Sequence, residues 1–280
     1  MTYRKVDAGR GVEWLKQSVQ LLLKNPAPFA LMGLMMAVLM AVPVLGGLAL
    51  LILGPALYAG FMVAARNQES GAPVEFTQLF AAFQQEGKLP KMLALCLPAV
   101  AAMIVLGILA AVVIGGAMLG GGLSAASGSD AFALAALGGG GIVFVLLALV
   151  VGFLTYALVF FAIPRVMFDD VEPFAAMKES FSAVIANIGA VLVYMALVLV
   201  VYIVLAITIG NVSALLLQIV AGVVVVPVIA VAVYRSYRDV FGGDGAVITG
   251  ESAAVAPPAD PPQPPAAPLG PNDPTPPPAA

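Results

Sequence analysis

The densest group of side chains able to do chemistry is a run of acids, Asp169, Asp170 and Glu172. Carboxylate oxygens are the ligands that Mg²⁺ and Ca²⁺ prefer, so the run could hold a divalent cation or supply a general acid and base at a membrane face. The alternative is structural, because Pro173 follows at once and suits the first turn of a helix, where acids act as caps and complement the helix dipole. The chain has no histidine. The sequence therefore favours the cap and predicts no metal site and no cofactor.

A second candidate is Gly9-Arg10-Gly11, an arginine between two glycines that precedes an amphipathic segment. Open backbone amides with a guanidinium can bind phosphate. The spacing matches neither a P-loop nor a dinucleotide fingerprint. We expect Arg10 to reach lipid phosphates and the Trp14 ring to lie at the headgroup level, where amphipathic rings are favoured.

The long apolar runs contain no Asp, Glu, Lys, Arg or His. Ionisable groups at that depth normally mark proton relays or ion paths, so their absence argues against a proton-coupled transporter or an ion pump. Gln218 is the main intramembrane polar residue. We expect it to form an interhelical hydrogen bond, with a substrate contact as the alternative.

The elements that must position these residues are membrane helices. The chain of 280 residues has a mean hydropathy of +1.07, with 62% apolar and only 10% charged residues, whereas soluble domains carry about 25% charged residues. Runs of 18 or more apolar residues recur, each long enough to cross a bilayer as a helix. We therefore predict an all-α, polytopic membrane protein with six transmembrane helices in three helical hairpins.

An amphipathic segment is expected before each hairpin. Lys16, Ser18 and Asn25 correspond to Lys178, Ser180 and Asn187 at a constant offset, and a fainter copy runs from Val74 to Phe83. Apolar residues at helical spacing predict that each copy is a helix lying along the membrane surface. The residues expected at the membrane interface are Arg10, Trp14, Phe76, Phe80, Phe174 and Phe181.

The predicted organisation has three parts. Residues 1–25 form an N-terminal amphipathic helix, and residues 26–238 form a six-helix membrane domain with polar loops at 66–91 and 165–188. The glycine-rich stretch 120–141 is expected to be a linker. Residues 239–280 form a tail in which 12 of the last 24 residues are proline, a composition typical of an extended, disordered segment.

Basic residues predict the orientation. All 12 Lys and Arg residues lie before the first span, after the second and fourth, or after the sixth. The positive-inside rule then places both termini and all three amphipathic helices in the cytoplasm. The single cysteine, Cys96, allows no intrachain disulfide, and nothing in the composition suggests binding to nucleic acid.

The Gly9-Arg10-Gly11 and Trp14 pattern, before a first span closed by Pro43-Val44-Leu45-Gly46, carries a resemblance over residues 3 to 240. The chain resembles a family of uncharacterised proteobacterial membrane proteins with a G-R-G-x-x-W opening. The resemblance implies six spans, cytoplasmic amphipathic segments and a bacterial inner-membrane location. It brings no activity and no site residues.

The sequence thus favours a non-enzymatic, multi-pass protein that organises or binds membrane partners or lipids. Its expected partners are the lipid bilayer and a further membrane protein or a second copy of the chain. The rival hypothesis is a transporter or flippase of an apolar or lipidic molecule, and the third is an enzyme acting at the membrane face.

Overall fold

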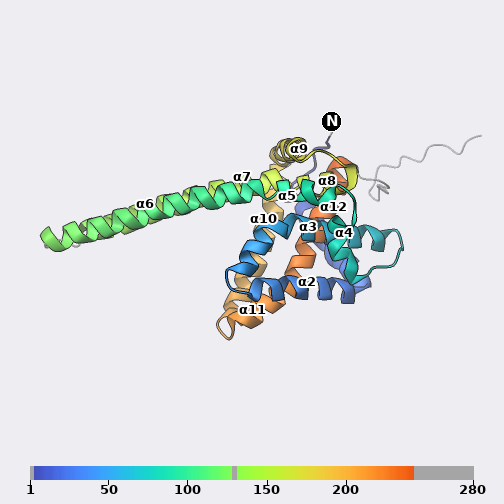
Figure 1. Ribbon diagram of the computed structural model, residues 1–280, viewed down its shortest axis with the longest axis horizontal. Helices are drawn as coiled ribbons and strands as arrows, with labels where there is room; N and C mark the ends of the chain where they lie inside the picture. The colour runs from blue at the N-terminus through green and yellow to red at the C-terminus, as the bar shows by residue number, and fades with distance from the viewer. Residues whose placement is uncertain (1–2, 128–130, 243–280) are drawn as a thin grey trace, which may run out of the picture. The chain divides into compact units, whose positions relative to one another are not determined.

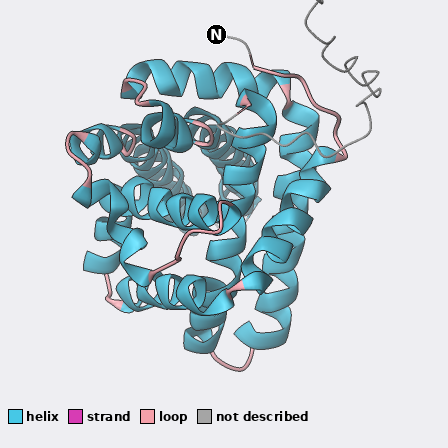
Figure 2. Cartoon of the chain, turned by 90° about the vertical axis from the view of Figure 1, so that its right-hand side faces the viewer, coloured by secondary structure: helices cyan, strands magenta, loops and turns pink. Residues whose placement is uncertain are grey.

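The computed structural model describes residues 3–127 and 131–242, and the regular elements in these ranges are helices (Figures 1 and 2). The expectation of an all-α chain is confirmed for these residues. Residues 243–280, which make up nearly all of the proline-rich tail, lie outside the described ranges.

The prediction of several helices long and apolar enough to span a membrane is also confirmed, with five to six in place of six. The segment expected to be the first span forms α2, Pro26–Ala41, and its 16 residues reach about 24 Å, less than the ~30 Å hydrocarbon core. It meets α1, Arg10–Lys24, at 108°, so the pair is a sixth span only if it counts as one broken helix. Among the described residues, the five helices that are long and apolar enough are Leu45–Glu69, Lys88–Gly116, Gly140–Asp169, Ile188–Gly210 and Ala214–Phe241.

Four of these five spans are not uniform α-helices. Pro98 and Pro164 stand in the first turn after short breaks in the second and third, as expected where a proline removes a backbone donor. The fourth and fifth each contain a π-helical segment, a local form that is frequent at functional sites. In chain order the pieces are α3 (Leu45–Glu69), α5 (Lys88–Ala94), α6 (Leu97–Ser127), α7 (Ala131–Val159), α8 (Ala162–Asp169), α10 (Ile188–Leu205), π-helical η2 (Ala206–Gly210), α11 (Ala214–Val220), π-helical η3 (Ala221–Val225) and α12 (Val226–Phe241).

The glycine-rich stretch 120–141 is helical wherever the structure describes it, which corrects the expectation of a linker. Helix α6 continues to Ser127 and α7 begins at Ala131. In an apolar solvent every backbone amide needs an internal partner, and that requirement outweighs the low helix propensity of glycine.

The amphipathic segments form three helical units that pack on spans. Helix α1 packs on α10 and α12, and α9, Pro173–Ala186, packs on α7 and α8. The middle unit, expected as one helix, is a 3₁₀ turn η1, Phe76–Phe80, followed by the short α4, Ala81–Gln84, and both pack on α3.

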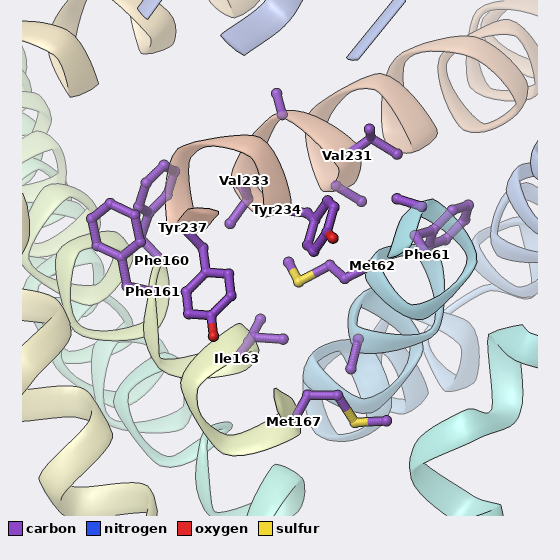
Figure 3. Close-up of a cluster of buried hydrophobic side chains, with 14 of the residues drawn as sticks. Phe61, Met62, Phe160, Phe161, Ile163, Met167, Val231, Val233, Tyr234 and Tyr237 are labelled. Carbon is purple, nitrogen blue, oxygen red and sulfur yellow. The ribbon is translucent and has the colours of Figure 1, made fainter. Parts of the chain in front are cut away.

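A single hydrophobic core joins these units. Figure 3 shows part of it, where α12 meets α3 and the α7–α8 segment: Met62, Ile163 and Val233 lie beside Tyr234 and Tyr237. Trp14 from α1 belongs to the same core and is fully buried. The core therefore holds α1 and the spans together.

Candidate functional site

The candidate site is the exposed surface of α1 and α9. The outer face of α1, by which we mean Val12, Lys16, Val19 and Leu23, has its members at positions i, i+4, i+7 and i+11. Leu23 is 70% exposed, although it is large and apolar. These four side chains form one stripe along the helix.

Helix α9 repeats this stripe. Its outer face, defined as Phe174, Lys178, Phe181 and Ile185, has the same spacing and the same order of apolar, lysine, apolar, apolar. Phe174 is 71% exposed and Phe181 is half-buried. Two helices distant in sequence thus present one pattern to their surroundings.

The opposite face of each helix is buried in the protein. On α1 it includes Trp14 and Ser18, and on α9 it includes Ser180, all of them fully buried. The Ser180 hydroxyl donates to the carbonyl oxygen of Ala157 at 2.7 Å and accepts from the backbone amide of Phe161 at 2.9 Å. Those two bonds fix α9 at the point where α7 ends.

Asp239, on α12, anchors the N-terminal part of α1. Its carboxylate accepts from Nε of Arg10 at 2.7 Å and from the indole N–H of Trp14 at 3.0 Å, and Arg4 lies 3.6 Å away. Arg10 and Trp14, expected at the headgroup level, thus both bind a carboxylate of the protein itself. A buried indole commonly takes such a partner.

We expect Asp239→Asn to loosen α1 without unfolding the spans. The amide keeps the shape of the side chain but removes the charge that holds two arginines, and hydrogen bonds to charged groups are worth about 1.5–3 kcal/mol. Amide hydrogen exchange in α1 should become roughly tenfold faster or more. Asp7→Asn, at an exposed position, is the matched control, and equal exchange in the two variants would contradict the anchoring role.

A second ionic group ties α9 to the spans. Arg165 is 9% exposed at its side chain and donates to Glu179 of α9 at 2.7 Å and to Asp169. The Tyr237 hydroxyl lies 2.9 Å from both oxygens of Asp169. A third group centres on Glu69, which binds Arg235, Arg238 and the hydroxyl of Tyr234. We call the region formed by these groups, at the ends of α3, α8 and α12, the charged end.

The three acids Asp169, Asp170 and Glu172 bind different partners. Asp169 belongs to the Arg165 group, whereas Asp170 is bound by Lys88 at 2.8 Å and Lys91 at 3.1 Å, and Glu172 by Lys91 at 2.8 Å. A hydrogen bond from Lys88, and to a lesser extent one from Lys91, holds the pKa of Asp170 below its ordinary value. Among the described residues no three potential ligands come together as a metal site. The expected side-chain cap is not formed, because Asp170 ends α8 and Glu172 precedes α9 without a cap hydrogen bond.

Comparisons with protein-family models, with curated proteins and with solved structures found no match for this chain.

Two residues of the middle unit, Phe76 and Phe80, are half-buried and join Phe83 in a ladder of edge-to-face rings, with centroids 6.0 Å apart at each step. Their exposed neighbour Phe83 extends the apolar surface of this unit. The middle unit thus presents aromatic rings, whereas the outer faces of α1 and α9 combine apolar side chains with one lysine.

Gln218 forms the interhelical hydrogen bond that the sequence favoured, from its side-chain amide to the carbonyl oxygen of Ala37 on α2 at 3.0 Å. It also lines a cavity of about 510 Å³ between α2, α10 and α11, together with Tyr202 and Gly222. The substrate-contact alternative therefore remains compatible with its position.

Sequence reasoning missed Glu69, Arg165 and Asp239, although a signal for them exists. Each of the three spans that enter the charged end closes with an arginine followed three or four residues later by an acid: Arg66 and Glu69, Arg165 and Asp169, Arg235 and Asp239. A recurring pair at the end of an uncharged span indicates an ionic group at that level.

Proposed function

We propose that the protein is a non-enzymatic multi-pass protein of a bacterial inner membrane that organises the membrane surface by binding anionic lipid through α1 and α9. The observation that carries this proposal is the outer face that the two helices share. Exposed Val, Leu, Ile and Phe side chains around a single lysine are costly in water but suit the boundary between acyl chains and phosphates.

A polar strip on α1 supports this arrangement. Glu13, Gln17 and Gln20 lie at helical spacing between the buried face and the outer face. A helix with one face on protein, one apolar face exposed and one polar strip fits the line where protein, hydrocarbon and water meet. There the lysine of the outer face can extend its ammonium group to the phosphates while its stem stays among apolar groups.

The distribution of basic residues supports the side of the membrane. Lys and Arg gather before α2, at the end of α3 and in α5, in α8 and α9, and at the end of α12. The positive-inside rule then favours cytoplasmic termini, so α1 and α9 would lie on the leaflet that carries anionic lipids. Each lysine near such a surface contributes about 1 kcal/mol, or about fivefold in lipid preference.

Depth-dependent quenching tests the proposal. Single cysteines placed at Val19 or Phe181 carry an environment-sensitive fluorophore, and the full chain is held in nanodiscs that contain lipids brominated along the acyl chain. We expect strong quenching at both positions because bromine and fluorophore would share the acyl boundary. Lys16→Glu with Lys178→Glu should reduce the preference for anionic over zwitterionic brominated lipid by about tenfold or more.

The controls are cysteines at Gln20 and Ala175, which are exposed but lie outside the outer faces. The unmodified chain, labelled in parallel, corrects for reaction at the buried Cys96. Quenching at the control positions that equalled or exceeded that at Val19 and Phe181 would refute the proposal.

Transport of an apolar or lipidic molecule is a second candidate, and the cavity at Gln218 favours it. Two π-helical segments, η2 and η3, contribute residues to that cavity, and such segments are frequent at functional sites. Movement of a fluorescent lipid between leaflets of proteoliposomes, abolished by Gln218→Leu, would support transport over a purely organising role.

A further inference from the structure

A second cavity, which we call the tyrosine chamber, has a volume of about 720 Å³ and lies between α3, α6, α7 and α12. Most of its lining is apolar, and its polar side chains include those of Tyr58, Thr155 and Tyr156. A cavity of this size falls in the range of ligand sites. None of its lining residues is charged.

The chamber opens toward the apolar sides of the spans. Met103 lines it and is 49% exposed, and Gly152 lines it and is exposed as well. Met103 lies about three helical turns from Lys91 along the same span, and so well inside its apolar part. On the side of the charged end the lining consists of Met62, Ile163 and Val233, which pack beside Tyr234 and Tyr237 in Figure 3. A ligand would therefore enter from hydrocarbon.

Phenol groups gather beside the chamber with too few partners. Within the described part of the chain the Tyr58 hydroxyl has no protein hydrogen bond, and Tyr58 lines the chamber together with Tyr156. The Tyr194 side chain is 1% exposed, and its hydroxyl lies near that of Tyr156 without a hydrogen bond of acceptable geometry. Thr155 is different, because its hydroxyl donates to the carbonyl oxygen of Val151 at 2.8 Å.

A buried hydroxyl without a partner costs about 1–3 kcal/mol. The Tyr194 hydroxyl is buried in this way. Tyr58 is half-buried and lines a chamber that opens to hydrocarbon, so its hydroxyl can donate to an acceptor that arrives from the lipid phase. Tyr58 lies eight residues before Arg66 on α3, about 12 Å along the helix axis, below the level of charged headgroups. With no charged residue in the lining, a charged group next to the acceptor would be buried without a counter-ion.

We propose that the tyrosine chamber binds an uncharged lipid whose long chain fills the cavity and whose carbonyl oxygen accepts a hydrogen bond from Tyr58. The shared chemistry is a carbonyl attached to an apolar chain, as in an isoprenoid quinone or a neutral acyl ester such as diacylglycerol. The inference goes beyond the proposed surface function, because this site lies inside the spans and none of its lining residues belongs to α1 or α9.

Lipid bound to the purified full chain tests the chamber. Gly54 lines it, and a Cβ added there meets no atom within 4 Å, so Gly54→Leu should extend into the chamber and fill the space. Gly47→Leu is the matched control: Gly47 is also on α3, a Cβ added there meets no atom within 4 Å, and it lies outside the lining. Solvent extraction and mass spectrometry should find a neutral carbonyl lipid with the wild type and with Gly47→Leu, and at least tenfold less with Gly54→Leu.

Tyr58→Phe tests the hydrogen bond. Delipidated protein is titrated with two probes, a short-chain isoprenyl benzoquinone and dioctanoylglycerol, and binding is measured by the rise in Tm. One probe should bind, and Tyr58→Phe should weaken it about threefold to tenfold, as expected for one hydrogen bond. The stronger probe identifies the source of the carbonyl.

Three results would overturn the inference: extracts with phospholipid alone, equal lipid in the two glycine variants, or no Tm response to either probe. Lys16→Glu with Lys178→Glu should leave the chamber lipid unchanged. That variant therefore separates failure here from failure of the surface proposal.

Discussion

Glu69→Gln is expected to destabilise the fold by about 3–5 kcal/mol, the usual cost of removing one partner from a buried ion pair. The Glu69 carboxylate is 13% exposed and binds Arg235 and Arg238 of α12, and it accepts from the Tyr234 hydroxyl at 3.0 Å. Glutamine keeps the shape but removes the negative charge that both guanidinium groups bind. A fall in Tm of roughly 6–20 °C should follow in thermal unfolding of the detergent-solubilised protein.

Glu86→Gln is the control, because Glu86 is exposed and surface substitutions usually change stability by less than about 0.5 kcal/mol. A second measurement follows from the same helix contacts. Proteolysis of the loop after α3 should become faster in Glu69→Gln, since α3 and α12 are no longer joined at the charged end. If the Tm of Glu69→Gln were within 1–2 °C of that of Glu86→Gln, the ionic group around Glu69 would contribute little to stability, like an ordinary surface salt bridge.

The spans could be predicted from the sequence because lipid leaves a helix few alternatives. An uncharged run of sufficient length must satisfy its own backbone hydrogen bonds, so composition alone identifies α3 and α10. Asn25-Pro26 and Pro43 also marked real boundaries, where α1 passes to α2 and where α2 ends before α3. The count was less certain, since α2 is too short to span alone.

The two faces of α1 could not be separated in the same way. Periodicity placed Val12, Leu15, Val19 and Leu22 on one apolar arc of α1. In the structure Leu22 is buried, whereas Val12 and Val19 are exposed. One part of this apolar arc thus packs on protein and the other part faces the exterior. Hydropathy cannot tell the two parts apart, because the residues of both are apolar. Only the packing of α1 against α10 and α12 divides them.

The charged end was hidden for a different reason. Glu69 pairs with residues more than 160 positions away, and Asp239 with Arg4 and Arg10 at the other end of the chain. The side-chain types were visible in the sequence, but partner choice depends on which spans are neighbours. The tyrosine chamber is hidden in the same way, since Tyr58 of α3 and Tyr156 of α7 line one cavity only in the folded chain.

The crossing of α2 over η3 gives the second large expected effect. Gly33 of α2 faces Gly222 so closely that a Cβ on Gly33 would overlap the carbonyl oxygen of Gly222, and a Cβ on Gly222 would lie 2.6 Å from that of Ala37. The obstacles include backbone atoms and a Cβ, which cannot rotate away. Gly33→Ala should therefore force the helices apart, at a cost of about 1–3 kcal/mol and roughly 2–12 °C in Tm.

Gly47→Ala distinguishes this contact from the general effect of adding a methyl group to a membrane helix, because a Cβ added at Gly47 meets no atom within 4 Å. Alanine there should be neutral or stabilising, since it lowers the entropy of the unfolded chain. The crossing also holds the cavity at Gln218, which Gly222 and Ala37 line. Gly33→Ala should therefore weaken the Gln218 hydrogen bond to Ala37 as well, and combining it with Gln218→Leu should cost less than the sum of the two separate losses. Strict additivity of the two substitutions would show that the helix crossing and the amide contact are independent.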